Sequence, residues 1–244
     1  MTKTKLQTIF LTAAMALCLA VPAHAQKLTV KDEGEGKYAY LKESGVKEIM
    51  ARFPAPPAAG SAQERKDKLE VLDWQTARTD QQCEAAMKQE DVKLTGFFTG
   101  DAYPFEGQPP EVLEFFKKTG ADMRLACRLM KNHFKRPRPS DPSIIYCTQE
   151  VGSKYSYPSR HAATAFLFAI ILSELDPANR EKYLQAADRS GQYRVIAGVH
   201  YPTDLIAGSN FARDLYPEFN QNPNFQKDLQ SLRKYLKKKP AKKK

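Results

Sequence analysis

The stretch YPSRHAATAFLFAIIL, residues 157–172, predicts a helix that is apolar on most of its faces and therefore buried. Ser159 is a residue type favoured at helix N-caps, so we expect the helix to run from Ser159 through Leu175. A histidine, His161, lies in its first turn beside Arg160. A helix start gathers backbone N–H donors and the positive end of the helix dipole, and both favour a bound anion.

Further helices are predicted on both sides of this stretch. Apolar residues recur at close to 3.6-residue spacing over 111–135, and we expect further helices over 176–200 and 201–216. We expect Gly120 to split the first of these segments and Gly191 to interrupt the second. Alternating strand patterns are scarce, so the sequence predicts an all-α, single-domain helical bundle.

The first 25 residues differ in character from the rest. Lys3 and Lys5 precede a short apolar run, and an A-x-A pattern ends at Ala25, which is typical of a cleaved secretory signal peptide over residues 1–25. The run is too short for a comfortable membrane span, and no later segment is apolar enough to cross a bilayer. We therefore expect an exported protein with no transmembrane segment.

Positive charge is concentrated at the two ends of the chain. The leader carries two lysines and residues 233–244 carry eight Lys and Arg, which together equal the net charge of +10, so the core is close to neutral. We expect residues 233–244 to form a lysine-rich disordered tail, whose role the sequence leaves open. Residues 26–60 are expected to be an extended, Pro-rich N-terminal segment, followed by a helical domain over 61–232.

Three cysteines, Cys83, Cys127 and Cys147, remain after removal of the leader. In an oxidising compartment this odd number predicts one disulfide and one thiol, and the sequence leaves the pairing open. Their spacing fits no zinc motif, so we predict no metal site.

Three short segments place cations and histidines at defined spacings. Lys131 precedes Arg138-Pro139 in the pattern K-x6-R-P, and Pro158-Ser159-Arg160-His161 follows. The third segment joins Arg194, His200 and Asp204 in the pattern R-x5-H-x3-D. A phosphate dianion needs several cationic donors around its oxygens, and these residue types supply them.

In order and spacing, these segments resemble the signature K-x6-R-P, P-S-G-H, S-R-x5-H-x3-D. That signature belongs to the superfamily of bacterial non-specific acid phosphatases, type 2 phosphatidic acid phosphatases and vanadium haloperoxidases. Within it the chain looks most like the soluble, periplasmic class A acid phosphatases, and the resemblance covers about residues 53–215. It implies a periplasmic, metal-independent enzyme without a cofactor that hydrolyses small phosphate esters and requires no nucleic acid. Family members often form homodimers or larger homo-oligomers, and the sequence leaves this open.

The resemblance also implies a role for each matched residue. His200 attacks phosphorus and becomes phosphohistidine, His161 protonates the leaving group, and Asp204 hydrogen-bonds the nucleophilic imidazole. The phosphate-binding set comprises Lys131, Arg138, Ser159, Arg160 and Arg194. Arg136 competes with Arg138 for the motif position, and the x6 spacing together with Pro139 favours Arg138.

Two positions depart from the signature. Arg160 replaces a glycine and is expected to add positive charge at the mouth of the site, and Tyr193 replaces a serine and would narrow the pocket if it faced the site. The alternatives are a lipid or isoprenyl (di)phosphate phosphatase, a vanadate-binding haloperoxidase and a phosphate-binding relative in which these changes have silenced turnover. The preferred substrate stays open.

Overall fold

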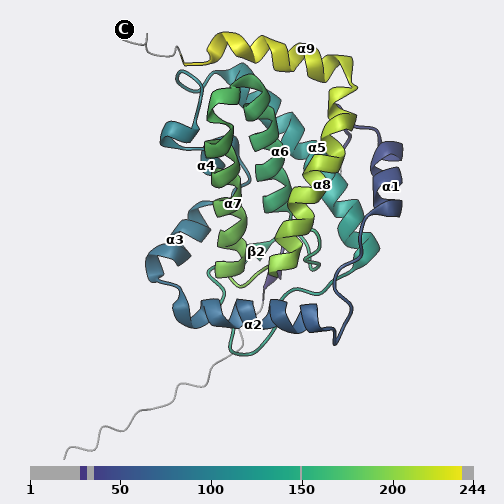
Figure 1. The fold of residues 1–244 in the computed structure, drawn as a ribbon, viewed down its shortest axis with the longest axis vertical. Coiled ribbons are helices and arrows are strands. Elements are labelled where there is room, and N and C mark those ends of the chain that lie inside the picture. The colour runs from purple at the N-terminus through teal and green to yellow at the C-terminus, as the bar shows by residue number, and fades with distance from the viewer. Residues whose placement is uncertain (1–27, 32–35, 149, 238–244) are drawn as a thin grey trace, which may run out of the picture.

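The computed structural model describes residues 28–31, 36–148 and 150–237 (Figure 1). The predicted signal peptide and residues 238–244 of the predicted tail lie outside these ranges. The all-α prediction is confirmed, because the strands in the described ranges are one parallel pair of two residues each, β1 (Thr29–Val30) and β2 (Glu150–Val151). The helices are α1 (Glu43–Arg52), α2 (Ala62–Ala77), α3 (Asp80–Lys88), α4 (Leu94–Phe97), α5 (Pro110–Phe134), α6 (Arg160–Leu175), α7 (Arg180–Ile196), α8 (Pro202–Asn220) and α9 (Pro223–Ser231).

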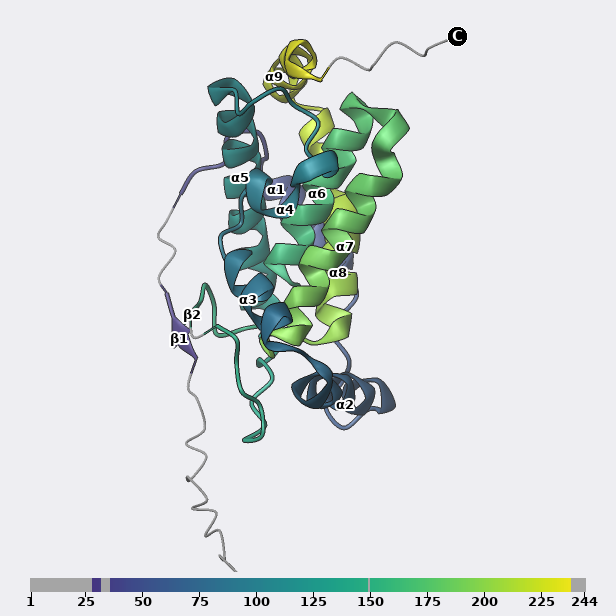
Figure 2. The ribbon, with the colours of Figure 1, turned by 90° about the vertical axis from the view of Figure 1, so that its left-hand side faces the viewer.

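Helices α5, α6, α7 and α8 run side by side and form the body of the molecule (Figure 1). Helix α2 crosses one end of this bundle and α9 crosses the other (Figure 1). The strands β1 and β2 lie on the outer side of the bundle (Figure 2). Helix α6 is the central element, since most of its residues are buried, as its apolar sequence predicts. Its Phe168 packs edge-on against Phe116 of α5, with ring centroids 4.9 Å apart.

A glycine brings α8 against the start of α6. A Cβ atom at Gly208 would lie 2.6 Å from the Ser159 carbonyl oxygen, so a larger residue would force the two helices apart. The close approach lets the Ser159 backbone N–H donate to the Asp204 carbonyl at 2.9 Å. The second and third signature segments are thereby held together by main-chain contact.

The predicted breaks at Gly120 and Gly191 are wrong, because α5 and α7 both run through these positions. Each glycine instead lies where a neighbouring helix comes close. A Cβ atom at Gly120 would meet the Phe168 ring at 3.3 Å, and one at Gly191 would meet the Ala162 Cβ at 3.6 Å. Packing across the helix–helix contact offsets the helix-propensity cost of glycine.

Both flanks of the bundle are more ordered than predicted. The N-terminal segment expected to be extended contains α1, which packs in the main core through Val46 and Ile49. At the other end, the Tyr235 carbonyl accepts from the Glu106 N–H at 2.9 Å, and the Lys237 N–H donates to the Pro104 carbonyl at 2.8 Å. The first residues of the expected tail, up to 237, are therefore attached to the domain.

The disulfide joins Cys83 to Cys147, which settles the pairing that the sequence left open. It links α3 to the loop before β2, across a sequence separation of 64 residues. Cys127 remains a buried thiol in α5.

Candidate active site

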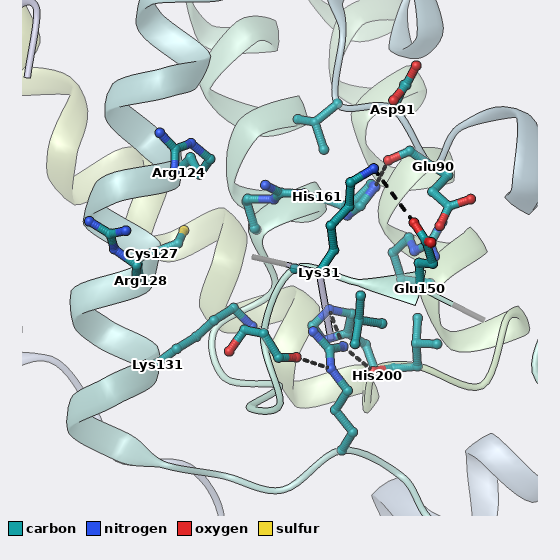
Figure 3. Close-up of a pocket in the computed structure, with 18 of the residues that line it drawn as sticks. Lys31, Glu90, Asp91, Arg124, Cys127, Arg128, Lys131, Glu150, His161 and His200 are labelled. Carbon is teal, nitrogen blue, oxygen red and sulfur yellow. Dashed lines mark hydrogen bonds and ion pairs between the residues drawn. The ribbon is translucent and has the colours of Figure 1, made fainter. Parts of the chain in front are cut away.

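The three signature segments meet at one cavity of about 630 Å³ (Figure 3). Its deep part, here called the floor, is formed by buried side chains from the end of α5 and the loop after it, the start of α6, the end of α7 and the turn between α7 and α8. The floor consists of Lys131, Arg138, His161, Arg194 and His200. The outer part, here called the rim, consists of Lys31, Lys88, Lys93, Arg124 and Arg128.

A tight turn returns His200 to the end of α7. Gly198 has a left-handed φ of +78°, and a Cβ atom there would lie 2.7 Å from the Ile144 side chain. The Arg194 carbonyl accepts from the N–H groups of Val199 and His200, at 3.1 and 3.2 Å. The turn therefore places the nucleophile candidate beside Arg194, six positions earlier in the sequence.

Hydrogen-bond partners define the tautomer of His200. Its Nε2 lies 3.2 Å from an Arg138 guanidinium nitrogen, and its Nδ1 lies 3.2 Å from Asp204 Oδ2. Because a guanidinium can only donate, Nε2 is the acceptor and Nδ1 carries the proton that goes to Asp204. The lone pair of Nε2 thus points toward the cations of the cavity.

Burial and charge keep His200 neutral. Its pKa is well below the usual value, first because the ring is buried and then because Arg138, Lys131 and Arg194 surround it. Burial raises the pKa of Asp204, while the Arg136 guanidinium and the Tyr201 N–H oppose that rise. A neutral imidazole with its lone pair on Nε2 is the form that can attack an electrophile.

His161 is oriented by a backbone carbonyl. Its Nε2 donates to the Glu90 carbonyl at 2.9 Å, so Nδ1 is the nitrogen with which it can exchange a proton with a ligand. Burial lowers the pKa of His161 well below its usual value, and Arg194 and Arg160 lower it further. An anion in the cavity would reverse the effect of the two arginines.

The cations of the floor are held by main-chain oxygens. Lys131 Nζ donates to the carbonyls of Tyr155 and Ser156 at 2.8 and 2.9 Å, which uses two of its three N–H bonds. Arg194 donates to the Ala86 carbonyl at 3.0 Å, while its buried Nε has no hydrogen-bond partner in the described structure. Burial also lowers the pKa of Arg194 to about 10. An anion would satisfy the Arg194 Nε and stabilise both charges.

The two arginines of the RPRP segment have different positions. Arg138 lines the cavity and donates to the Ser153 and Val199 carbonyls, both at 2.7 Å. Arg136 lies behind the floor and pairs with Asp204 at 2.7 Å. This geometry supports the assignment of Arg138 as the motif arginine.

The remaining predicted residues have distinct positions. Ser159 is the N-cap of α6, as predicted, and its hydroxyl accepts from the Ala162 N–H at 3.4 Å. Arg160 lines the cavity and is half-buried. Tyr193 packs against a small apolar cluster with Cys147 and Val151, so it does not narrow the pocket as it would if it faced the site.

Most of the rim could not be predicted from the sequence. Lys31 comes from β1 and pairs with Glu150 at 3.7 Å, and Lys93 pairs with Asp91 at 2.7 Å. Among the rim residues, only Arg124 and Arg128 could have been found from the sequence. They precede Lys131 by seven and three positions, a spacing that places all three on one face of α5.

The described residues contain no group of three His, Cys, Asp or Glu side chains arranged to bind a metal ion. They also contain no helix with the length and apolarity of a membrane span.

Comparison with known proteins identifies the class to which this fold and site belong. The family model of the PAP2 superfamily matches residues 122–213. A non-specific acid phosphatase of Providencia stuartii is 31% identical over 205 residues, which cover 80% of this chain and 83% of that protein. A lipid A 1-phosphatase of Rhizobium etli is 39% identical over 92 residues, or 36% of this chain and 40% of that protein. The crystal structure of a bacterial vanadium-dependent iodoperoxidase has a TM-score of 0.52 at 17% identity, covering 70% of this chain and 52% of that one, which supports the fold alone.

The chain belongs to the PAP2 superfamily. The resemblance inferred from the three motifs is confirmed, and the protein is an enzyme of the acid phosphatase type.

Proposed function

We propose that the protein is an exported acid phosphatase that hydrolyses phosphate monoesters through a phosphohistidine at His200, without a metal ion. One observation carries the proposal: the Nδ1–H of His200 donates to the buried Asp204, which leaves Nε2 directed at a cavity lined by buried cations. Lys131, Arg138 and Arg194 supply the positive charge that metal ions supply in other phosphatases.

In the first step, His200 Nε2 attacks phosphorus and the ester P–O bond breaks. The imidazole becomes positively charged, and Asp204 stabilises that charge through the Nδ1–H hydrogen bond. His161 gives a proton from Nδ1 to the departing alkoxide, while its Nε2–H stays on the Glu90 carbonyl. The products are the alcohol and phosphohistidine.

In the second step, water replaces the alcohol. The now neutral Nδ1 of His161 takes a proton from the water as its oxygen bonds to phosphorus. The P–N bond breaks, its electron pair returns to His200 Nε2, and inorganic phosphate leaves. Both histidines are then in their starting protonation states.

An acidic pH optimum follows from the two pKa directions. His200 must be neutral to attack, and its lowered pKa keeps it neutral in mild acid. His161 must be protonated to act as an acid, and its lowered pKa restricts this form to the acid side of neutrality, extended upward by the charge of a bound substrate. Activity is thus expected to fall as pH rises through the pKa of His161.

A second candidate is the hydrolysis of lipid phosphates. The likeness to a Rhizobium etli lipid A 1-phosphatase favours it, although that match covers little more than a third of the chain. An assay of lipid phosphates in detergent micelles beside soluble esters would distinguish the two substrate classes.

The first test is hydrolysis of a chromogenic aryl phosphate across pH 4–9 in excess chelator, with the wild type and His200→Ala. We expect chelator-resistant activity with an acidic optimum, inhibition by vanadate, and loss of a covalent phosphoryl adduct in the variant. Activity that the chelator abolishes would contradict the metal-independent mechanism. Phosphate binding without hydrolysis would instead favour a silenced phosphate-binding protein.

Export is tested separately. Cleavage of the leader after Ala25 predicts that the N-terminal residue of the secreted protein is Gln26, which N-terminal sequencing of the periplasmic fraction would detect. Retention of the full-length chain in the cytoplasm would contradict it.

A further inference from the structure

The cavity wall carries more positive charge than one phosphate monoester needs. Among the residues that the structure describes, nine Lys and Arg side chains line it, against three Asp and Glu. Three of the nine, Lys131, Arg138 and Arg194, belong to the floor, and the other six lie around it. A monoester dianion brings at most two negative charges, which the floor alone can neutralise. The remaining cations surround the outer part of the cavity.

Two of these cations share a helix face with the floor lysine. Arg124 and Arg128 precede Lys131 by seven and three positions on α5, a spacing that keeps all three on one face. Figure 3 shows both arginines on α5, above Lys131. Both arginines are half-buried and line the cavity, and the Arg124 guanidinium also lies beside Gly36, where a Cβ atom would be 3.2 Å from it.

Arg160 connects the outer cavity electrostatically to the floor. Its charge contributes to the lowered pKa of Lys131, of His161 and of Arg194, so it lies within range of each of them. This is the residue that replaces the glycine of the family signature.

We propose that Arg124 and Arg128, together with Arg160, form an outer anion subsite that binds a second phosphoryl group of the substrate. The inference rests on the proposed function and specifies its substrate class as diphosphates and bisphosphates. Guanidinium groups match phosphate oxygens with paired hydrogen bonds, and the cavity has the volume of sites that take small organic ligands.

Two substrate pairs test the subsite and distinguish linked from separated phosphates. AMP is compared with ADP, and fructose 6-phosphate with fructose 1,6-bisphosphate. We expect the wild type to favour at least one of the doubly phosphorylated members about tenfold in kcat/KM, and the preference to approach one in the Arg124→Gln/Arg128→Gln double variant. Lys118→Gln removes an exposed charge from the same helix and should keep the preference.

No preference in the wild type, or an undiminished preference in the double variant, would overturn the subsite. If the wild type hydrolyses nothing, the proposed function fails, and the subsite is then tested by binding. Pyrophosphate should raise the Tm of the wild type more than inorganic phosphate does, and the double variant should lose that difference. Equal shifts in the wild type would overturn the subsite as well.

A different observation carries a second inference: a buried ionic chain lies behind His200. Arg136 donates from one guanidinium nitrogen to Asp204 Oδ1 and from the other to Asp67 Oδ2 of α2, both at 2.7 Å. Thr203 joins the chain by accepting from Arg136 at 2.7 Å and donating to Asp67. Asp67 is 1% exposed and Asp204 fully buried, so water does not screen these contacts.

The chain restricts how Asp204 can turn. Its Oδ2 accepts from His200 Nδ1 and, at 2.9 Å, from the Tyr201 N–H, while Arg136 holds its other oxygen. Arg136 is in turn held by Asp67, which comes from outside all three signature segments. We infer that Asp67 is a positioning residue for His200, acting through Arg136 and Asp204.

The test combines two variants with a matched control. Asp67→Asn and Thr203→Val should lower kcat about 10- to 100-fold while KM and vanadate affinity stay near wild type. Asp73→Asn removes an exposed carboxylate from the same helix and should change neither parameter. A merely structural role would lower Tm and vanadate affinity with no selective effect on kcat, and would overturn the inference. If Asp67→Asn does not fold, or if the wild type has no activity, the ¹⁵N chemical shifts of the His200 ring are measured in Thr203→Val. We expect loss of the single Nδ1–H tautomer. An unchanged tautomer would overturn the inference.

Discussion

The floor and the rim of the cavity are both cationic, yet they are built in different ways. Floor side chains are buried, and the floor cations donate to backbone carbonyls, as Lys131 does to Tyr155 and Ser156. Rim side chains are half-buried or exposed, and their observed ion pairs, such as Lys93 with Asp91, lie at the surface. The floor is therefore preorganised for one reaction, whereas the rim can adjust to different ligands. We expect changes in the floor to alter the chemical step and changes in the rim to alter substrate choice.

The largest expected effect is that of Asp204→Asn. An amide at this position can present its NH2 group to His200 Nδ1, which would favour the tautomer with the proton on Nε2 and remove the attacking lone pair. We expect kcat to fall about a thousandfold or more, with much smaller loss of vanadate affinity. Steady-state kinetics and vanadate titration measure the two effects. A fall of less than tenfold would show that Asp204 does not set the tautomer.

The next largest effect is that of His161→Ala, and it depends on the leaving group. An alkyl alkoxide needs a proton as it departs, whereas nitrophenolate leaves without one. We expect kcat/KM to fall about a thousandfold for an alkyl phosphate and much less for a nitrophenyl phosphate. Equal losses for the two esters would exclude a general-acid role and indicate that His161 mainly binds phosphate.

The floor could be predicted from the sequence because its residues lie in three short segments with defined spacing. The start of α6 at the N-cap Ser159 could be predicted from neighbouring residues alone, because a serine, which is favoured at N-caps, precedes an apolar run. The positive-φ Gly198 returns His200 to Arg194 through a turn that is also local in sequence.

The contacts around the floor could not be predicted, because they join distant residues. The carbonyl of Glu90 orients His161 from 71 positions away, and a backbone oxygen has no sequence signature. Asp67 and Arg136 are 69 positions apart, on segments with no shared pattern. Gly120 and Gly191 were misread as helix breaks because sequence alone does not show which helix packs against a glycine. Tertiary packing decides all of these features.

The disulfide tests how far the contacts that hold the floor depend on a covalent constraint. Cys83 lies in α3, which also contains Ala86 and ends just before Glu90. The carbonyl of Ala86 accepts from Arg194, and that of Glu90 accepts from His161. Opening a 64-residue loop by Cys83→Ser/Cys147→Ser should destabilise the fold by about 4 kcal/mol. Thermal unfolding measures this loss, and kcat at 25 °C should fall less than tenfold as long as the variant stays folded. Unchanged stability would show that packing alone fixes this side of the cavity.

The smallest expected effect is a shift in the pH profile when Arg160 is replaced by glycine, the family residue. Burial lowers the pKa of His161 most, and the charges of Arg194 and Arg160 lower it further. Removing one of these charges should raise the pKa of His161 and keep its acid form to higher pH. The basic limb of activity should therefore move upward, and the shift should be small because Arg160 is half-exposed and its charge is screened. Arg160→Gln should give the same shift, since it also removes the charge, and Lys118→Gln should give none. A downward shift, or a shift with glycine but not glutamine, would show that Arg160 acts on the backbone at the helix start and not through its charge. The limb is read from kcat of an alkyl phosphate, whose leaving group needs the His161 proton, and high salt should move the wild type in the same upward direction.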